Sequence, residues 1–189
     1  EVVEREFAQW EAEQVDVSDE LADARRTAAY VNWSCVVAPE GQLYRPTMYM
    51  SKNWMDNVWS WDHCFNALAL VDKNPALAWD QFMVMFDVQD EFGALPDYIN
   101  DVECVWNFCK PPIHGWTLRR MLERTDAITV EHLAEVYGPL CRWTGWWLSY
   151  RDSDGDGLPE YHHGNDSGWD NATLFAHGVP VEAPDLSAF

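Results

Sequence analysis

The sequence predicts an all-α fold in which helical hairpins are arranged as a toroid. Apolar residues recur at helical spacing in several segments of the 189-residue chain, strand alternation is nearly absent, and long loops rich in aromatic and polar residues alternate with the helices. Loops carry function when a rigid scaffold positions them, so we expect a functional site where these loops gather. An open helical bundle or a solenoid is the alternative fold.

Apolar periodicity and capping residues predict five helices. They are expected over residues 19–37, 62–72, 74–89, 114–124 and from residue 130 onward. Ser18 is the expected N-cap of the first helix, and Asn74 followed by Pro75 opens the third, because proline suits the first helical position. The apolar stripe of the fifth helix consists of Val130, Leu133, Val136, Tyr137, Leu140, Cys141, Trp147 and Leu148. Pro139 is expected to start a new turn or a kink there.

The segment GQLYRPTMYMS, residues 41–51, is the place where a short strand is expected. The sequence contains no Pro/Gly/Ser-rich linker and no low-complexity tract. We therefore interpret residues 1–189 as one mostly helical unit.

Composition and charge exclude several classes of partner. The net charge of -20 would repel phosphate backbones, so no nucleic-acid partner is expected. No apolar run reaches the length of a bilayer span, and the N-terminal EVVEREFAQWEAEQ does not resemble a signal peptide, so no membrane partner is expected. The five cysteines form no CxxC pair, which argues against a zinc or redox motif. Their odd number favours a reducing compartment, and cytoplasmic localisation is expected.

Tryptophan is the strongest compositional signal, with 12 residues. Flat indole faces pack cores, but they also stack on the C–H face of a pyranose in sugar sites. Core packing accounts for Trp143, Trp146 and Trp147 better than it accounts for the loop NWMDNVWSWDHCF, residues 53–65.

Five segments occur in the order WSWDHCFNALAL, FGALPDYIN, KPPIHGW, DSDGDGLPEYHHGNDSGWDN and APDLSAF. Together they resemble the catalytic domain of glycoside hydrolase family 63, which includes processing α-glucosidase I and bacterial relatives that act on α-glucosides and α-mannosides. The resemblance spans roughly residues 44–189 and is specific because five separate motifs agree in order. It implies an (α/α)6 barrel, an inverting exo-α-glycosidase acting on oligosaccharides or small glycosides, and no organic cofactor. Trehalases of a neighbouring family have a similar SGWD element.

The resemblance further implies that Asp170, in GWDN, is the general acid. Inverting hydrolysis needs one carboxylic acid to protonate the leaving oxygen and one carboxylate to activate water, roughly 6.5–9.5 Å apart. Trp169 is expected to contact the substrate and to raise the pKa of the neighbouring acid by partial burial. The alternative role of Asp170 is an N-cap of a following helix, and Asp166 is the next candidate for the acid.

Other loops supply candidate sugar ligands. The resemblance implies that Asp62 accepts hydrogen bonds from sugar hydroxyls and that Trp59 or Trp61 stacks on the sugar ring. The alternative for Asp62 is a helix cap. The remaining residues expected to line the pocket are Asp97, Asn100 and His114.

The loop DSDGDGLPE, residues 152–160, predicts a calcium site. Hard oxygen ligands alternate with glycines that permit a tight turn. The expected ligands are Asp152, Asp154, Asp156 and Glu160. An EF-hand is not expected, because His163 occupies the twelfth position of that loop. The alternative is a polar turn without a metal.

The complete barrel of the family has about twice as many helices as this sequence predicts, and the family's general base lies well C-terminal to the acid. We therefore expect residues 1–189 to be a partial catalytic domain, truncated after Phe189. The missing C-terminal half would come from the same or a second polypeptide. The alternatives are a non-catalytic carbohydrate-binding half-domain, a trehalase-like hydrolase and a calcium-dependent structural module.

Overall fold

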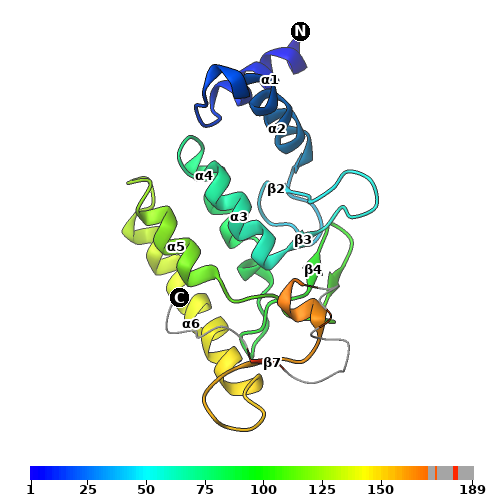
Figure 1. The fold of residues 1–189 in the computed structure, drawn as a ribbon, viewed down its shortest axis with the longest axis vertical. Coiled ribbons are helices and arrows are strands. Elements are labelled where there is room, and N and C mark those ends of the chain that lie inside the picture. The colour runs from blue at the N-terminus through cyan, green and yellow to red at the C-terminus, as the bar shows by residue number, and fades with distance from the viewer. Residues whose placement is uncertain (170–172, 174–180, 183–189) are drawn as a thin grey trace.

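The computed structural model describes residues 1–169, 173 and 181–182, and it is mostly helical, which confirms the predicted fold class (Figure 1). The α-helices are α1 (Val2–Ala12), α2 (Ala22–Cys35), α3 (Ser60–Leu70), α4 (Pro75–Met83), α5 (His114–Leu122) and α6 (Val130–Tyr150). Single turns of 3-10 helix are η1 (Asp19–Leu21), η2 (Phe86–Val88) and η3 (Gly164–Ser167). All five predicted helices are present, with shifted ends.

Helix α1 has no counterpart among the predicted helices. It forms a hairpin with α2 at one end of the molecule (Figure 1). The two helices meet through aromatic rings, since the Phe7 and Trp33 ring centroids lie 5.4 Å apart. Trp10 is the buried residue of α1, so an apolar stripe long enough to reveal the helix is missing from the sequence.

The N-terminal end of the first predicted helix differs from the expectation. Residues Asp19–Leu21 form the 3-10 turn η1, and the α-helix begins at Ala22. Ser18 precedes this turn but makes no side-chain capping bond. Its hydroxyl instead donates a hydrogen bond of 3.3 Å to Glu20 Oε1, so Ser18 occupies the predicted N-cap position, now of η1, without making a side-chain capping bond.

Helix α4 begins as predicted. Asn74 Oδ1 accepts a hydrogen bond of 3.2 Å from the Leu77 amide, and Pro75 occupies the first helical position. The helix ends at Met83, earlier than expected. The apolar run on which the expectation was based continues beyond the helix into the separate 3-10 turn η2. Apolar periodicity cannot separate two short helical segments that are buried against the same core.

Helix α6 continues through Pro139 without a new helix start, so the predicted new turn is wrong. A proline has no backbone N–H, so the carbonyl four residues earlier in the helix loses its usual hydrogen-bond donor. The Pro139 carbonyl itself accepts a hydrogen bond of 3.0 Å from Gln89 Nε2, which ties α6 to the end of η2.

The described strands are all two residues long and pair antiparallel. They are β1 (Val36–Val37), β2 (Thr47–Met48), β3 (Val58–Trp59), β4 (Tyr98–Ile99), β5 (Cys104–Val105), β6 (Glu160–Tyr161) and β7 (Val181–Glu182). They form the pairs β1–β2 and β6–β7 and the three-stranded order β3–β4–β5. Strand β2 confirms the short strand expected in residues 41–51.

The core lies between α3, α4, α5 and α6, where Phe82, Met121, Trp143 and Trp147 are buried. The strands β2, β3 and β4 and the orange segment that contains η3 lie on one side of these helices (Figure 1). The loops therefore gather as the hairpin pattern predicts. Within the described part of the chain, no helix combines the length and the apolar character that a bilayer span requires.

Candidate functional site

A cavity of about 530 Å³ lies where β3 runs into α3. Four of the predicted substrate-binding residues line it, namely Trp59, Trp61, Asp62 and Asp97. These residues come from two loops that are distant in sequence. The pairing of β3 with β4, in register Trp59↔Tyr98, brings the two loops together.

The β3–α3 junction determines how the first three of these side chains lie. Trp59 packs on Tyr98 with ring centroids 5.8 Å apart, and Trp61 meets Phe65 edge-on at 5.7 Å. Asp62 sits in the first turn of α3, where the helix dipole stabilises a negative charge. The junction therefore presents two indoles and a carboxylate to one cavity, which is the combination that sugar recognition uses.

Gly168 also lines this cavity and lies against Trp61. Its φ of 73° is in the left-handed region that favours glycine. A Cβ at this position would lie 2.3 Å from Trp61 Cζ2, so no other residue fits without displacing the indole. Ser167 closes the turn, since its hydroxyl donates to the Gly164 carbonyl and accepts from the Trp169 amide, at 2.6 and 3.0 Å.

Asp166, which belongs to the same turn, is buried and anchors it through hydrogen bonds. Its Oδ2 accepts hydrogen bonds of 3.0 Å from the His162 and His163 amides, and its Oδ1 accepts one of 3.1 Å from the Cys109 amide. Arg151 Nη1 adds an ion pair at 3.3 Å. These contacts hold the Asp166 side chain in one orientation inside the turn. Asp166 therefore anchors this turn, and its place as the next candidate for the general acid stays a prediction.

Asp97 forms a buried ion pair at the cavity wall. Its Oδ1 lies 2.8 Å from Lys110 Nζ, and the two side chains are 7% and 9% exposed. Lys110 Nζ also donates a hydrogen bond of 2.8 Å to the Asn165 carbonyl in η3. One ammonium group therefore joins the loop that carries Asp97 to the turn that precedes Gly168.

Two predicted pocket residues lie elsewhere. Asn100 is absent from the cavity lining, and its Oδ1 accepts the Val102 and Glu103 amides at 2.8 Å, which closes the β4–β5 turn. His114 is fully buried in the core, where its Nδ1 accepts a hydrogen bond of 3.1 Å from Trp143 Nε1. Burial lowers the pKa of His114 to about 3, so the ring is neutral. Both residues have structural roles at these positions.

The predicted catalytic centre lies at the boundary of the described residues. Trp169 is 70% exposed and does not line the cavity in this structure. Asp170 lies outside the described residues, as does the APDLSAF segment.

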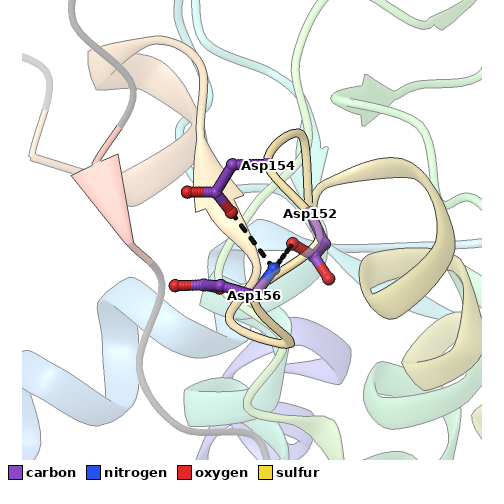
Figure 2. A group of neighbouring side chains, drawn as sticks. All are labelled: Asp152, Asp154 and Asp156. Carbon is purple, nitrogen blue, oxygen red and sulfur yellow. Dashed lines mark hydrogen bonds between the residues drawn. The ribbon is translucent and has the colours of Figure 1, made fainter.

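The aspartate loop after α6 brings three of the four predicted calcium ligands together (Figure 2). Carboxylate oxygens of Asp152, Asp154 and Asp156 lie within 4.8 Å of one another. The turn is closed by backbone donors, since the Asp156 amide donates to Asp152 Oδ1 at 3.1 Å and to Asp154 Oδ1 at 3.3 Å. Three converging hard oxygen donors on a glycine-containing loop fit a calcium ion, with further oxygens from water or backbone.

Glu160 does not join this group. Its Oε2 accepts a hydrogen bond of 3.3 Å from the Ser153 amide and lies 3.4 Å from His162 Nε2. The hydrogen bond with Ser153 lowers the pKa of the Glu160 carboxyl. The structure thus uses Glu160 to fasten the base of the loop, and the expected four-carboxylate set is reduced to three.

Residues 55–183 match the family model described as the mannosylglycerate hydrolase MGH1-like glycoside hydrolase domain. This range contains the cavity-forming β3–α3 junction, the Asp97–Lys110 pair and the turn at Gly168. The chain belongs to this glycoside hydrolase family. The resemblance to glycoside hydrolase family 63 is thereby confirmed.

Two curated relatives of this family domain are similar to the chain. The glucosylglycerate hydrolase of Mycolicibacterium hassiacum is 25% identical over 164 residues, which are 68% of this chain and 37% of the relative. The mannosylglycerate hydrolase MGH1 of Selaginella moellendorffii is 24% identical over 148 residues, which are 66% of this chain and 30% of the relative. The chain thus spans about a third of the length of these relatives.

Solved structures of the family have the same fold. The GH63 mannosylglycerate hydrolase from Thermus thermophilus in complex with Tris superposes with a TM-score of 0.68 at 20% identity. The match covers 80% of this chain and 39% of that chain. The complex of that hydrolase with glucose gives a TM-score of 0.65 at 19% identity. This likeness supports the predicted helical toroid, of which the family domain described here supplies a part.

Sequence reasoning did not identify Lys110, Met50 and Met55 as lining residues of the family domain's cavity. Lysine in KPPIHGW carries no local signal, because its significance comes from contacts with Asp97 and Asn165, which are remote in sequence. The methionines follow a strand too short to show alternation. Their proximity to the tryptophans of the 53–65 loop is the one hint that the sequence offers.

Proposed function

We propose that this chain is part of the catalytic domain of an inverting α-glycoside hydrolase that acts on small glycosides of glucose or mannose. The observation that carries the proposal is the packing of Gly168 on Trp61, which joins the SGW turn to the cavity of Trp59, Trp61, Asp62 and Asp97. Membership of the glycoside hydrolase family supports the reaction class. The names of the relatives make glucosylglycerate and mannosylglycerate the first substrates to test.

In this proposal the cavity binds the sugar that is released. An indole face of Trp61 or Trp59 stacks on the pyranose, while Asp62 and Asp97 accept hydrogen bonds from its hydroxyls. Charged acceptors held in place by a helix terminus and by an ion pair keep their orientation when the substrate is absent. Such preorganisation lowers the entropic cost of binding the sugar in a reactive geometry.

The chemical step requires two carboxyl groups on opposite sides of the glycosidic bond. Asp170 donates a proton to the leaving oxygen, which departs as the alcohol of the aglycone. A second carboxylate removes a proton from water, whose oxygen attacks the anomeric carbon and inverts its configuration. The general base belongs to the part of the toroid outside this chain, carried by the same or a second polypeptide, in line with the greater length of the relatives.

A substrate panel with product analysis tests the proposal. The protein that carries this chain is incubated with α-glucosylglycerate, α-mannosylglycerate, α-1,4- and α-1,2-linked disaccharides and trehalose. We expect hydrolysis of at least one glycerate glycoside, with the β-anomer of the sugar appearing first by proton NMR. An initial α-anomer would contradict inversion, and a lack of hydrolysis across the panel would contradict the enzymatic proposal.

The same panel separates the alternative functions. Hydrolysis of trehalose in preference to the glycerate glycosides would favour a trehalase-like enzyme. Sugar-dependent thermal stabilisation without turnover would favour a carbohydrate-binding module. Loss of folding on chelation together with no response to any sugar would favour a calcium-dependent structural module.

We also propose that the Asp152–Asp154–Asp156 loop binds a calcium ion. The convergence of three carboxylates within 4.8 Å supports this, because like charges at such distances repel unless a cation compensates them. The ion would fix the loop that links α6 to β6 and η3, and calcium would thereby support the cavity wall from a distance.

A further inference from the structure

Lys110 occupies an unusual position for a lysine. It lies in the segment between β5 and α5, it is buried, and it is one of the residues that line the cavity. Two acceptors surround the ammonium group at 2.8 Å, namely Asp97 Oδ1 and the Asn165 carbonyl. These acceptors belong to the two loops that the proposed reaction needs to hold in register.

The residues next to Lys110 hold the same turn. The Phe108 ring stacks on the His163 ring with centroids 4.6 Å apart, and the Cys109 amide donates to Asp166 Oδ1 at 3.1 Å. Three consecutive residues thus contact η3 or its N-cap: Phe108 by ring stacking, Cys109 by a backbone hydrogen bond and Lys110 through its ammonium group. Of the three, Lys110 alone also reaches a residue expected to bind the sugar.

Stability alone does not account for a buried Lys–Asp pair at this place. Desolvation of two charges offsets much of their attraction, and well-packed apolar residues of similar size are often as stabilising. An ion pair does fix the directions of its partners, because each charged atom must keep its hydrogen bonds when water is excluded. The desolvation cost of the Lys110–Asp97 pair is therefore explained if the pair serves to fix the orientation of side chains at the cavity wall.

We propose that Lys110 is a positioning residue that holds Asp97 and the Gly164–Trp169 turn in a fixed relation. The inference rests on the proposed glycosidase function. It assigns Lys110 no proton transfer and no contact with the reacting atoms. The expected consequences are a loss of kcat that depends on the leaving group and a change in KM that does not.

Two variants and one control test this role. Lys110→Met keeps the length and removes the charge, Lys110→Arg keeps the charge, and Lys73→Met removes an exposed lysine that pairs with Asp16 at 3.5 Å. For a glycerate glycoside, a poor leaving group, kcat should fall about 100-fold in Lys110→Met, as for a misplaced catalytic group. With the corresponding α-glycosyl fluoride, kcat should fall much less, whereas KM should rise by a similar factor for both substrates, because Asp97 loses the ion pair that orients it. Lys110→Arg should recover most of the loss, and Lys73→Met should match wild type.

Equal losses on both substrates in a folded Lys110→Met protein, or no loss at all, would overturn the inference. If Lys110→Met does not fold, Lys110→Gln is measured in its place with the same two outcomes. A wild-type protein without glycosidase activity would refute the proposed function instead. In that case hydrogen exchange still tests the positioning role, because the His162 and His163 amides should exchange about tenfold faster or more in Lys110→Met, while unchanged exchange would overturn it.

Discussion

The indole of Trp61 fills the space that a side chain at position 168 would need. A Cβ on Gly168 would lie 2.3 Å from Trp61 Cζ2 and 2.8 Å from Cε2. This contact connects the start of α3 with the turn after η3, and it decides how the wall of the cavity closes. The glycine of SGWD is thus required by packing as well as by its positive φ.

Substitution Gly168→Ala should therefore impair both stability and activity. A side chain at positive φ costs about 1–2 kcal/mol in the free energy of unfolding. The added Cβ would also displace the indole of Trp61, and a displacement of about 1 Å at a sugar site reduces kcat/KM by about 100-fold. Steady-state kinetics on the best glycerate glycoside and urea denaturation measure the two effects.

Gly155→Ala is the matched control for this variant. Gly155 has a φ of 74°, nearly the same as the 73° of Gly168, but no atom within 4 Å of its Cβ position. Its loss of stability should be limited to the cost of a side chain at positive φ. When both proteins are measured without calcium, kcat/KM of the variant should stay near the wild-type value. Similar kinetics for the two alanine variants would show that the Trp61 contact does not matter for activity.

Asp170→Asn tests the general acid proposed for the family domain. The amide keeps the shape of the side chain and any capping bond but has no proton to donate. On a substrate with a poor leaving group kcat should fall by about 10²- to 10⁴-fold, the usual contribution of a positioned acid. A glycosyl fluoride needs little protonation, so its hydrolysis should fall far less. Equal effects on the two substrates would assign Asp170 a structural role.

Asp166→Asn should give the opposite pattern. Asp166 accepts three backbone N–H bonds and pairs with Arg151. In the asparagine variant an NH2 group replaces one oxygen, so one or more of these N–H donors would meet another donor and lose its acceptor. Breaking a buried charge network of this kind costs about 3–5 kcal/mol. The midpoint of urea unfolding should drop, and the remaining activity should fall alike for good and poor leaving groups. A stable variant with a selective loss on the poor leaving group would make Asp166 the acid.

Calcium binding should depend on Asp154 and not on Glu160. Isothermal titration of the metal-free protein with Ca²⁺ should give one site, which Asp154→Ala abolishes because it removes one of three converging carboxylates. Glu160→Gln should retain the site, since Glu160 is engaged by Ser153 and His162. Titration curves that Asp154→Ala leaves unchanged would remove the calcium site from the proposal.

Stability should fall as the solution is acidified, in part because of His114. Burial lowers the pKa of His114 from 6.5 to about 3, so the unfolded chain binds a proton that the folded protein does not. This contribution is fully present above pH 6.5 and is lost as the pH falls from 6.5 to about 3, by up to about 1.4 kcal/mol per pH unit. His63, whose pKa burial lowers to about 4, acts in the same direction.

The variant His114→Gln checks this prediction. Its side-chain oxygen can accept the hydrogen bond from Trp143 Nε1, but it does not titrate. The slope of the unfolding free energy against pH, measured by urea denaturation between pH 6.5 and 4, should be smaller than in the wild type. An identical slope would mean that His114 is not the group responsible.

The sequence predicts those features of the fold that are encoded locally. Asn74 and Pro75 mark the start of α4, and the apolar stripe after Thr129 marks α6, because capping and periodicity are properties of neighbouring residues. Helix α1 was missed because its burial is confined to Trp10. The new turn predicted at Pro139 does not form, since packing of a long helix against the core outweighs the loss of one hydrogen bond.

The site was predictable where a residue type suggests its own chemistry. The indoles and carboxylates at positions 59, 61, 62 and 97 line one cavity, as the resemblance implies. Lys110 and the anchoring role of Asp166 could not be predicted, because both depend on contacts across more than 50 residues. His114 was assigned to the pocket for a similar reason, since the sequence does not tell which face of α5 points into the core.

The assembly of the cavity wall from remote segments has a consequence for folding. Cys109 and Asp166 are 57 residues apart, and the Gly168–Trp61 contact spans a still longer stretch. Closing long loops costs entropy before the contacts compensate for it, so helices form early and such contacts form late. A nascent chain on the ribosome would hold most of its helices before residues 164–168 emerge, yet it would have no finished sugar pocket. Protection of the nascent protein by sugar would therefore report the completion of folding, and not the formation of helices.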